Sequence, residues 1–250
     1  MNTEVITVAT HKEGYLNNII NNDYNIKVNV LGMGQKWTGF KMKYELVYNY
    51  IKNLDDNKII IFIDGFDSHI NGSINKAVDI FKKHNYKVLF SKNPKILGSF
   101  LDKKIFSTCY EDLIANTGLY MGYVKYLKKL LSFLLQVKCK DDQVSVNRNC
   151  HQFNFIKVDS QELIFKNIPF GQLSKINTKN YKQIFLGFPG QLTINRQSRT
   201  IIEYGQFFID IYLLLLAIAI FFLYKNNKKL VIMILLITII LILKIDKSCI

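Results

Sequence analysis

Two carboxylates directly follow a fully apolar segment in the first half of the chain. The run Ile59–Ile63 reads IIIFI, and Asp64 and Asp67 come next, with Gly65 and Phe66 between them. Carboxylate oxygens can hold Mg²⁺ or Mn²⁺ against a diphosphate, because hard divalent cations prefer oxygen ligands and stabilise the charge of a leaving phosphate. Aspartate and glycine are also common in the turn after any strand. A metal site and a structural turn are therefore both open at this point.

Segments with the apolar periodicity of strands and of helices alternate ahead of the carboxyl-terminal region. Strands are predicted at Val5–Thr10, Ile26–Leu31, Ile59–Ile63, Lys87–Phe90, Thr117–Tyr123, Phe153–Val158 and Ile184–Leu186. Helices are predicted at Lys41–Leu54, Ile74–His84 and Val124–Val137. The alternation predicts an α/β fold with a mainly parallel sheet and helices on both faces, in which ligands bind beyond the carboxyl ends of the strands. Asp64 and Asp67 lie at such an end.

The carboxyl-terminal region contains two apolar runs separated by the basic sequence KNNKK. These runs are Phe207–Tyr224 and Leu230–Ile245. Each is near the short end of what crosses a bilayer, which takes about 20 helical residues for a hydrocarbon core of roughly 30 Å. Neither run shows the polar face of a soluble helix. We expect a transmembrane helical hairpin at residues 207–245 that anchors a domain of residues 1–203. A single span with the other half lying in the membrane interface is the alternative.

The chain is basic, with 33 Lys and Arg against 19 Asp and Glu and a formal net charge of +14. Such an excess suits an anionic membrane surface, a nucleic acid or a phosphate-bearing substrate. The lysines are scattered along the chain instead of forming one stripe with interleaved aromatic residues. Nucleic-acid binding is therefore not expected.

The cysteines and the amino terminus both bear on the compartment. Cys109, Cys139, Cys150 and Cys249 show no spacing typical of a zinc site, so we expect reduced, structural thiols. The first residues lack the basic segment and the cleavage site of a secretory signal peptide. These features favour a cytosolic domain on a membrane anchor.

A series of short motifs occurs in the order found in a known family. The motifs are VITVAT, LGMGQKW, GFKMKYELVYNYI, IFIDGFDSHI, NTGLYMGYVKYLKKLL, DDQ and IKVDSQELIF. From Val5 to about Asn195, the chain resembles the glycosyltransferase domain of procollagen lysyl hydroxylases and related collagen-type glycosyltransferases, including viral members. The resemblance implies a GT-A fold and transfer of a hexose from a UDP-sugar, with Mn²⁺ or Mg²⁺, to a hydroxyl group of a glycan, protein or lipid acceptor.

The resemblance also implies roles for individual residues. Asp64 and Asp67 match the metal ligands of a D-x-x-D motif, and Asp141 and Asp142 match an acidic pair that faces the transferred sugar or the acceptor. The resemblance implies contacts with the nucleotide sugar for Thr10, Lys41 and Phe66. It also implies that Asn116, Thr117 and Gly118 form a turn of small residues, which permits a ligand to approach closely. From the residues alone, Asp141 and Asp142 equally suit a helix N-cap and a first-turn acid, and Lys41 suits a solvated helix face.

The chain departs from the family pattern near the end of the resemblance. The family supplies a third metal ligand from a histidine in H-G-x-G, whereas this chain reads IFLGFPG and has Gly187 at that position. His69 or His151 is a candidate replacement in space. The departure keeps open a catalytically degenerate membrane protein that binds a sugar nucleotide or a glycan. A metal-dependent phosphohydrolase is disfavoured, because the chain lacks an early D-x-D nucleophile motif.

Overall fold

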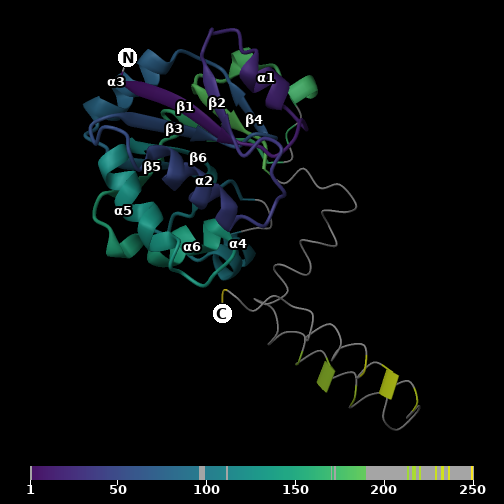
Figure 1. Ribbon diagram of the computed structural model, residues 1–250. Helices are drawn as coiled ribbons and strands as arrows, with labels where there is room; N and C mark the ends of the chain where they lie inside the picture. The colour runs from purple at the N-terminus through teal and green to yellow at the C-terminus, as the bar shows by residue number, and fades with distance from the viewer. Residues whose placement is uncertain are drawn as a thin grey trace. The chain divides into compact units, whose positions relative to one another are not determined.

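A sheet with helices packed against it forms the first part of the computed structural model (Figure 1). The structure describes residues 2–95, 99–110, 112–169, 171 and 173–189, and a few isolated residues from 213 onward. The chain divides into two compact units, Met1–Gln191 and Leu192–Ile250. The domain limits of 1–203 and 207–245 stay predictions.

Six strands form the main sheet of the described part of the chain, in the order β2-β1-β3-β6-β5-β7. They are β1 (Thr3–Val8), β2 (Val28–Leu31), β3 (Ile59–Ile63), β5 (Val88–Lys92), β6 (Ala115–Tyr123) and β7 (Ile156–Val158). β1 pairs in parallel with β2 and β3, and β5 pairs in parallel with β7, whereas β6 runs antiparallel between β3 and β5. The predicted mainly parallel α/β architecture is confirmed, and it is consistent with a GT-A-like fold.

Helices cover both faces of this sheet, as predicted. They are α1 (Leu16–Ile20), α2 (Lys41–Ile51), α3 (Ile74–Lys83), α4 (Ser99–Phe106), α5 (Val124–Leu134) and α6 (Asp142–Asn149), with short 3₁₀ turns at Cys150–Gln152, Leu173–Lys175 and Thr178–Asn180. Successive side chains of a strand point to opposite faces, so the fully buried β3 contributes to two cores. Ile60 and Phe62 pack in the core beneath α2, α5 and α6, and Ile61 packs in the core beneath α1 and α3.

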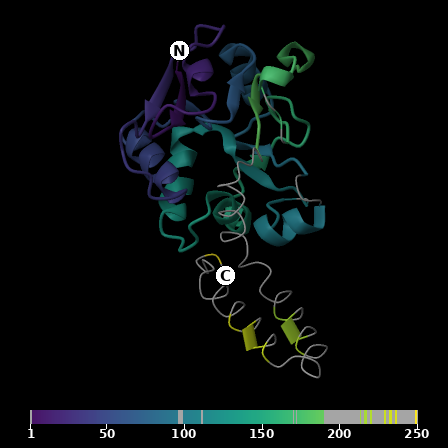
Figure 2. The same ribbon diagram turned by 90° about the vertical axis from the view of Figure 1, so that its right-hand side faces the viewer.

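A second, smaller sheet brings the end of the first unit next to the segment that follows β3. It contains β4 (Ser68–Ile70), β9 (Phe185–Gly187) and β8 (Phe165–Asn167), in the order β4-β9-β8. Figure 2 shows the green strands β8 and β9 beside the blue β4. Ser68 lies opposite Gly187 in the antiparallel pair, and Asn167 lies opposite Gly187 in the parallel pair. Gly187 therefore lies opposite the residue that directly follows Asp67.

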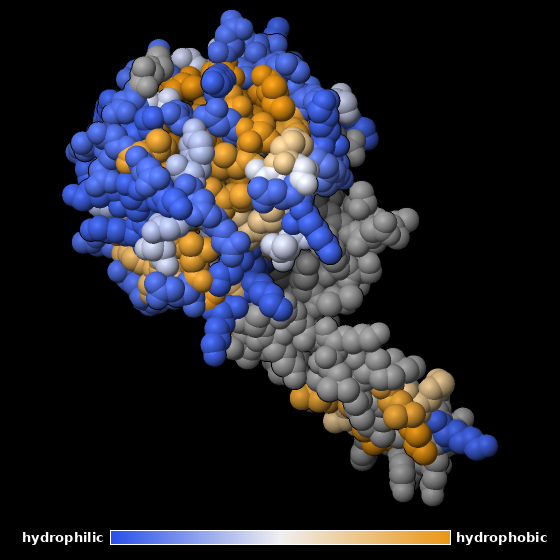
Figure 3. Space-filling view, in the orientation of Figure 1, coloured by the Kyte–Doolittle hydropathy of each residue, from blue (hydrophilic) through white to orange (hydrophobic). Residues whose placement is uncertain are grey.

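The predicted membrane hairpin at residues 207–245 lies almost entirely outside the described residues. Figure 3 shows that the described residues of the second unit are mostly apolar, and Leu213, Ile232 and Leu236 are exposed. Within the residues that the structure describes, no helix is long and apolar enough to cross a membrane.

Candidate active site

Asp64 is the first polar residue beyond the buried strand β3. Its backbone N–H donates to the carbonyl oxygen of Gly118 in β6, at 2.7 Å, so the backbone pairing continues one residue past the strand. The Asp64 side chain is 27% exposed, whereas every residue of β3 is buried. The strand therefore delivers a carboxylate to the surface at the carboxyl edge of the sheet, as expected from the sequence.

A buried lysine lies between this carboxylate and a second one. The Nζ atom of Lys43 is 3.1 Å from Oδ2 of Asp64 and 3.1 Å from Oδ2 of Asp142. Burial by itself lowers the pKa of Lys43, but the charges of Asp142 and Asp64 and their hydrogen bonds outweigh it, so the pKa lies well above its ordinary value. Lys43 is therefore a permanent cation that joins two carboxylates from distant parts of the sequence.

Lys43 is buried because it belongs to the apolar stripe of α2. Residues four apart lie on one face of a helix, and Lys43, Val47 and Ile51 share the face that packs on the sheet. Next to it, Tyr44 donates a 2.7 Å hydrogen bond to the backbone oxygen of Asp142. Lys41 was predicted from the sequence to be a site residue, and Lys43 was not. The sequence does place Lys43 among the apolar residues of this helix face. A lysine buried there requires charged or polar partners, which would have indicated a site residue.

Lys41 opens the same helix. Its Nζ donates to the carbonyl oxygen of Val137 at 3.2 Å, and the residue is half-buried. Lys41 is thus not a fully solvated side chain, and its contact with a nucleotide sugar stays a prediction.

Asp141 and Asp142 make different contacts. Asp141 is the N-cap of α6, and its Oδ1 accepts a 2.7 Å hydrogen bond from the backbone N–H of Val144. Asp142 lies in the first turn, and its Oδ1 accepts from the N–H of Gln143 at 3.0 Å. The capping interpretation is confirmed for Asp141. Asp142 is joined to Asp64 through Lys43.

Buried amide side chains surround this group of charges. Asn116 donates to Asn93 at 3.2 Å and to Gln143 at 3.1 Å, and Gln143 donates to Asn93 at 3.1 Å. Asn93 and Gln143 were not predicted to be site residues. The strand predicted at Thr117–Tyr123 is confirmed as part of β6, but β6 already begins at Ala115, so Asn116 lies in the strand and not in a turn that leads into it. A side chain at Gly118 would place its Cβ 3.3 Å from Oδ2 of Asp64, so the glycine keeps space open beside the carboxylate.

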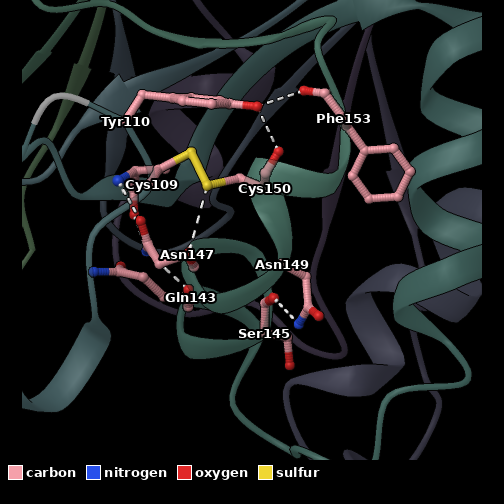
Figure 4. Close-up of a disulfide and its surroundings, with 9 residues drawn as sticks. Cys109, Tyr110, Gln143, Ser145, Asn147, Asn149, Cys150 and Phe153 are labelled. Atoms are coloured by element: carbon pink, nitrogen blue, oxygen red, sulfur yellow. Dashed lines mark hydrogen bonds between the residues drawn. A yellow bond between two sulfur atoms is a disulfide. The ribbon is translucent and has the colours of Figure 1, made fainter.

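A disulfide fixes the far end of α6 (Figure 4). Cys109 and Cys150 are bonded, with Cα atoms 5.5 Å apart and a sequence separation of 41. Tyr110 donates 2.7 Å hydrogen bonds to the carbonyl oxygens of Cys150 and Phe153, and Asn147 of α6 holds the backbone of Ala115 in β6. The expectation of reduced thiols is wrong for Cys109 and Cys150.

Thr10 and Phe66, both predicted to contact the nucleotide, lie on either side of His11. The Oγ1 atom of Thr10 is 3.0 Å from Nδ1 of His11, and the His11 and Phe66 ring centroids are 5.2 Å apart. The structure thus brings Thr10 and Phe66 together at the edge where Asp64 emerges. His11, which follows Thr10 directly, was not predicted to be a site residue.

Asn167 occupies the space of a side chain at Gly187. A Cβ at position 187 would lie 2.2 Å from Oδ1 of Asn167, whose Nδ2 donates to Oγ of Ser91 at 2.9 Å and to the carbonyl oxygen of Lys92 at 2.8 Å. Nearby, Phe188 N–H donates to the carbonyl oxygen of Asp67 at 2.7 Å. A histidine at position 187 would therefore clash with a fixed amide.

The two candidate replacement histidines do not complete a metal site. Burial lowers the pKa of His69, and the charge of Asp23 opposes this effect. His151 is exposed in the 3₁₀ turn beside the disulfide. Among the described residues, no group of three or more His, Cys, Asp or Glu side chains is placed to hold a metal ion.

The residues present nevertheless fit a hard divalent cation that shares its ligands with a substrate. Mg²⁺ is typically bound through one or two carboxylates together with substrate phosphates and water. Asp64 offers an accessible oxygen-donor group, Asp67 follows it in the same segment, and the missing side chain at Gly118 leaves room next to the carboxylate. Asp64 and Asp67 are the residues that would hold the cation.

A depression of about 670 Å³ lies away from these residues. Its lining includes Ile59, the first residue of β3, and Tyr123, the last residue of the antiparallel β6. It therefore lies at the amino end of β3, opposite Asp64, and we do not assign it to the candidate active site.

The chain is similar to known proteins over most of the first unit. Residues 1–185 match the family described as the PLOD GT domain. The multifunctional procollagen lysine hydroxylase and glycosyltransferase of Caenorhabditis elegans is 25% identical over 185 residues, covering 66% of this chain and 25% of the relative. Procollagen-lysine,2-oxoglutarate 5-dioxygenase of Drosophila melanogaster is 26% identical over 186 residues, covering 66% and 25%. Procollagen-lysine,2-oxoglutarate 5-dioxygenase 2 of Mus musculus is 26% identical over 158 residues, covering 56% and 21%.

The matched region spans about a quarter of the length of these relatives. It contains the carboxylates Asp64, Asp67 and Asp142, the bridging Lys43, and the residues Thr10 and Phe66. The match over residues 1–185 shows that the chain belongs to the family of PLOD glycosyltransferase domains.

Proposed function

We propose that the first unit transfers a hexose from a UDP-sugar to a hydroxyl group of a glycan, protein or lipid acceptor, with Mn²⁺ or Mg²⁺ held by Asp64 and Asp67. The observation that carries this proposal is the bridge from Asp64 through Lys43 to Asp142, each at 3.1 Å, within a domain of the PLOD glycosyltransferase family. The bridge joins the two acidic motifs that the resemblance assigns to the donor side and to the sugar side of the site.

The residues of the site then have separate functions. Thr10 and Phe66 bind the nucleotide, and Lys41 contacts the sugar nucleotide with a positive charge. Asp64 and Asp67 would hold the divalent cation, which would supply positive charge against the diphosphate that leaves the sugar. Asp142, fixed by Lys43 and Gln143, orients the hydroxyl groups of the sugar or acceptor at the reacting carbon. Asp141 supports Asp142 by capping the helix that carries it.

A donor screen tests this proposal. The full chain in detergent is incubated with a panel of UDP-sugars and Mn²⁺, with and without hydroxyl-bearing acceptors, and free UDP is measured. The proposal is supported if the unmodified chain releases UDP from one donor, if Asp67→Asn no longer releases it, and if Asp56→Asn still does. Asp56 is a suitable control because it pairs with Lys128 and is more than half exposed.

The second candidate is a protein that binds a sugar nucleotide or a glycan without turnover. The observation that favours it is the position of Asn167, which excludes a side chain at residue 187. Calorimetric binding of UDP-sugar without any release of UDP, across donors and acceptors, would select this candidate over the transferase.

Membrane attachment and compartment are further proposals. The apolar runs at 207–224 and 230–245 support an anchor in a lipid bilayer. The Cys109–Cys150 disulfide favours an oxidising compartment, in which such bonds persist, over the cytosol expected from the amino terminus. Both proposals are tested by adding protease to sealed membranes that contain the chain with an epitope at each end. The measurement is which epitope, and whether the first unit, is protected from digestion.

A further inference from the structure

The two ends of the Lys43 bridge differ in their access to solvent. The Asp64 side chain is 27% exposed, whereas those of Lys43 and Asp142 are 11% and 7% exposed. Lys43 forms a 3.1 Å ion pair with each carboxylate, and Oδ2 of Asp142 is buried. The buried Asp142 therefore depends on Lys43 for its counter-charge, whereas Asp64 is open to other cations.

Lys43 and a divalent cation would share one carboxylate. Two positive charges bound to the same group repel each other, and the repulsion is stronger where water is partly excluded. A diphosphate offsets this repulsion, because it adds negative charge at the same place. The positive charge of Lys43 thus opposes binding of a divalent cation at Asp64. This opposition is weaker when the diphosphate of a nucleotide is bound as well.

We propose that Lys43 is a positioning residue that weakens binding of a divalent cation at Asp64 until a diphosphate is bound, and that holds Asp142 in place for catalysis. This inference rests on the proposed function. It assigns two opposite effects to one side chain, which a merely structural lysine would not show.

The test measures Mn²⁺ binding separately from activity. Mn²⁺ affinity of the full chain in detergent is determined by electron paramagnetic resonance, with and without UDP, for the unmodified chain and for Lys43→Met. We expect Lys43→Met to bind Mn²⁺ about tenfold more tightly without UDP, because a nearby positive charge is removed. The gain in Mn²⁺ affinity on adding UDP should shrink, and UDP-sugar turnover should fall about tenfold or more.

Two further variants separate charge from folding. Lys43→Arg keeps the charge and should keep the Mn²⁺ affinity of the unmodified chain. Lys43→Met combined with Asp142→Asn removes both buried charges and should also bind Mn²⁺ more tightly, even if Lys43→Met alone does not fold. Lys128→Met is the control, because Lys128 likewise pairs with an aspartate, Asp56, and in addition donates to the backbone oxygen of Leu54. The Mn²⁺ affinity of this variant should not change.

The outcomes distinguish this inference from the proposed function. Unchanged or weaker Mn²⁺ binding in the folded Lys43 variants, while the unmodified chain binds Mn²⁺ with UDP, overturns the inference alone. Absence of Mn²⁺ binding in every variant, with and without UDP, overturns both.

Discussion

The hydroxyl group of Tyr44 donates a 2.7 Å hydrogen bond to the backbone oxygen of Asp142 and so fastens α2 to the first turn of α6. Tyr44 is 4% exposed, and burial, with the nearby charge of Asp142, raises the pKa of its hydroxyl group well above the ordinary value. The hydroxyl group of Tyr44 therefore keeps its proton, and the hydrogen bond is retained, over the physiological pH range. It places the ammonium group of the neighbouring Lys43 between two carboxylates.

Tyr44→Phe should lower the free energy of unfolding by about 1 kcal/mol, the usual net contribution of one hydrogen bond. The loss would be larger if the oxygen of Asp142 remains buried without a donor. Urea denaturation measures the change in stability. Tyr48→Phe is the control on the same helix, because Tyr48 is only half-buried. Equal stabilities of Tyr44→Phe and the unmodified chain would show that the contact with Asp142 contributes nothing.

Asp64→Asn should reduce metal-dependent UDP-sugar turnover by about 100-fold or more, because carboxylate ligands contribute several kcal/mol of charge stabilisation. The fold should remain, since the Asp64 side chain is partly exposed and its backbone pairing with Gly118 is unaffected. Turnover and circular dichroism are measured on the same sample. Loss of cooperative unfolding at unchanged specific activity would favour the structural turn over the metal site.

Replacing both Cys109 and Cys150 with serine should lower the free energy of unfolding by about 3–4 kcal/mol, as expected for opening a loop of this length. The disulfide also fixes the end of α6, so the turnover that depends on Asp142 should fall as well. Denaturation of the double variant is compared with that of the unmodified chain. Peptide mapping without reductant checks the pairing directly, and free thiols at both positions would contradict it.

Glu4 forms a charge cluster at the opposite end of the sheet. Its Oε1 accepts from Lys58 at 2.6 Å and its Oε2 accepts from Tyr50 at 2.7 Å. Burial raises the pKa of Glu4, but the hydrogen bonds and charge of Lys58 outweigh it, so the pKa lies below its ordinary value. Burial and the hydrogen bond to Glu4 raise the pKa of Tyr50 to about 12.

The pH dependence follows from these directions. Because the pKa of Glu4 is lowered by folding, its contribution to stability is present above its unfolded pKa and is lost as the pH falls through the folded value. Glu4→Gln should therefore destabilise the protein at pH 7 and have much less effect near pH 3. Thermal unfolding of both chains across this range measures the difference. A constant difference at all pH values would show that Glu4 acts by packing alone.

Part of the fold and of the site could be predicted from the sequence. The run Ile59–Ile63 predicts β3 because five successive apolar residues suit a strand buried on both faces, and Asp64 follows it at the carboxyl edge. The strands β4, β8 and β9 have three residues each, too few for periodicity to identify β4 and β8. The Lys43–Asp142 bridge and the Cys109–Cys150 bond join distant segments, so they follow from the tertiary fold and not from local spacing.

A chain that ends at Glu203 should be soluble without detergent and should bind UDP with the affinity of the full chain. The runs removed are almost entirely apolar, and each such side chain exposed to water forfeits roughly 1.5–3 kcal/mol relative to burial. The first compact unit ends at Gln191, and all proposed ligand groups lie within it. Size-exclusion chromatography and calorimetry with UDP measure both properties. Aggregation of the shortened chain, or extraction of the full chain from membranes by carbonate, would show that residues 207–245 belong to the core instead of a bilayer.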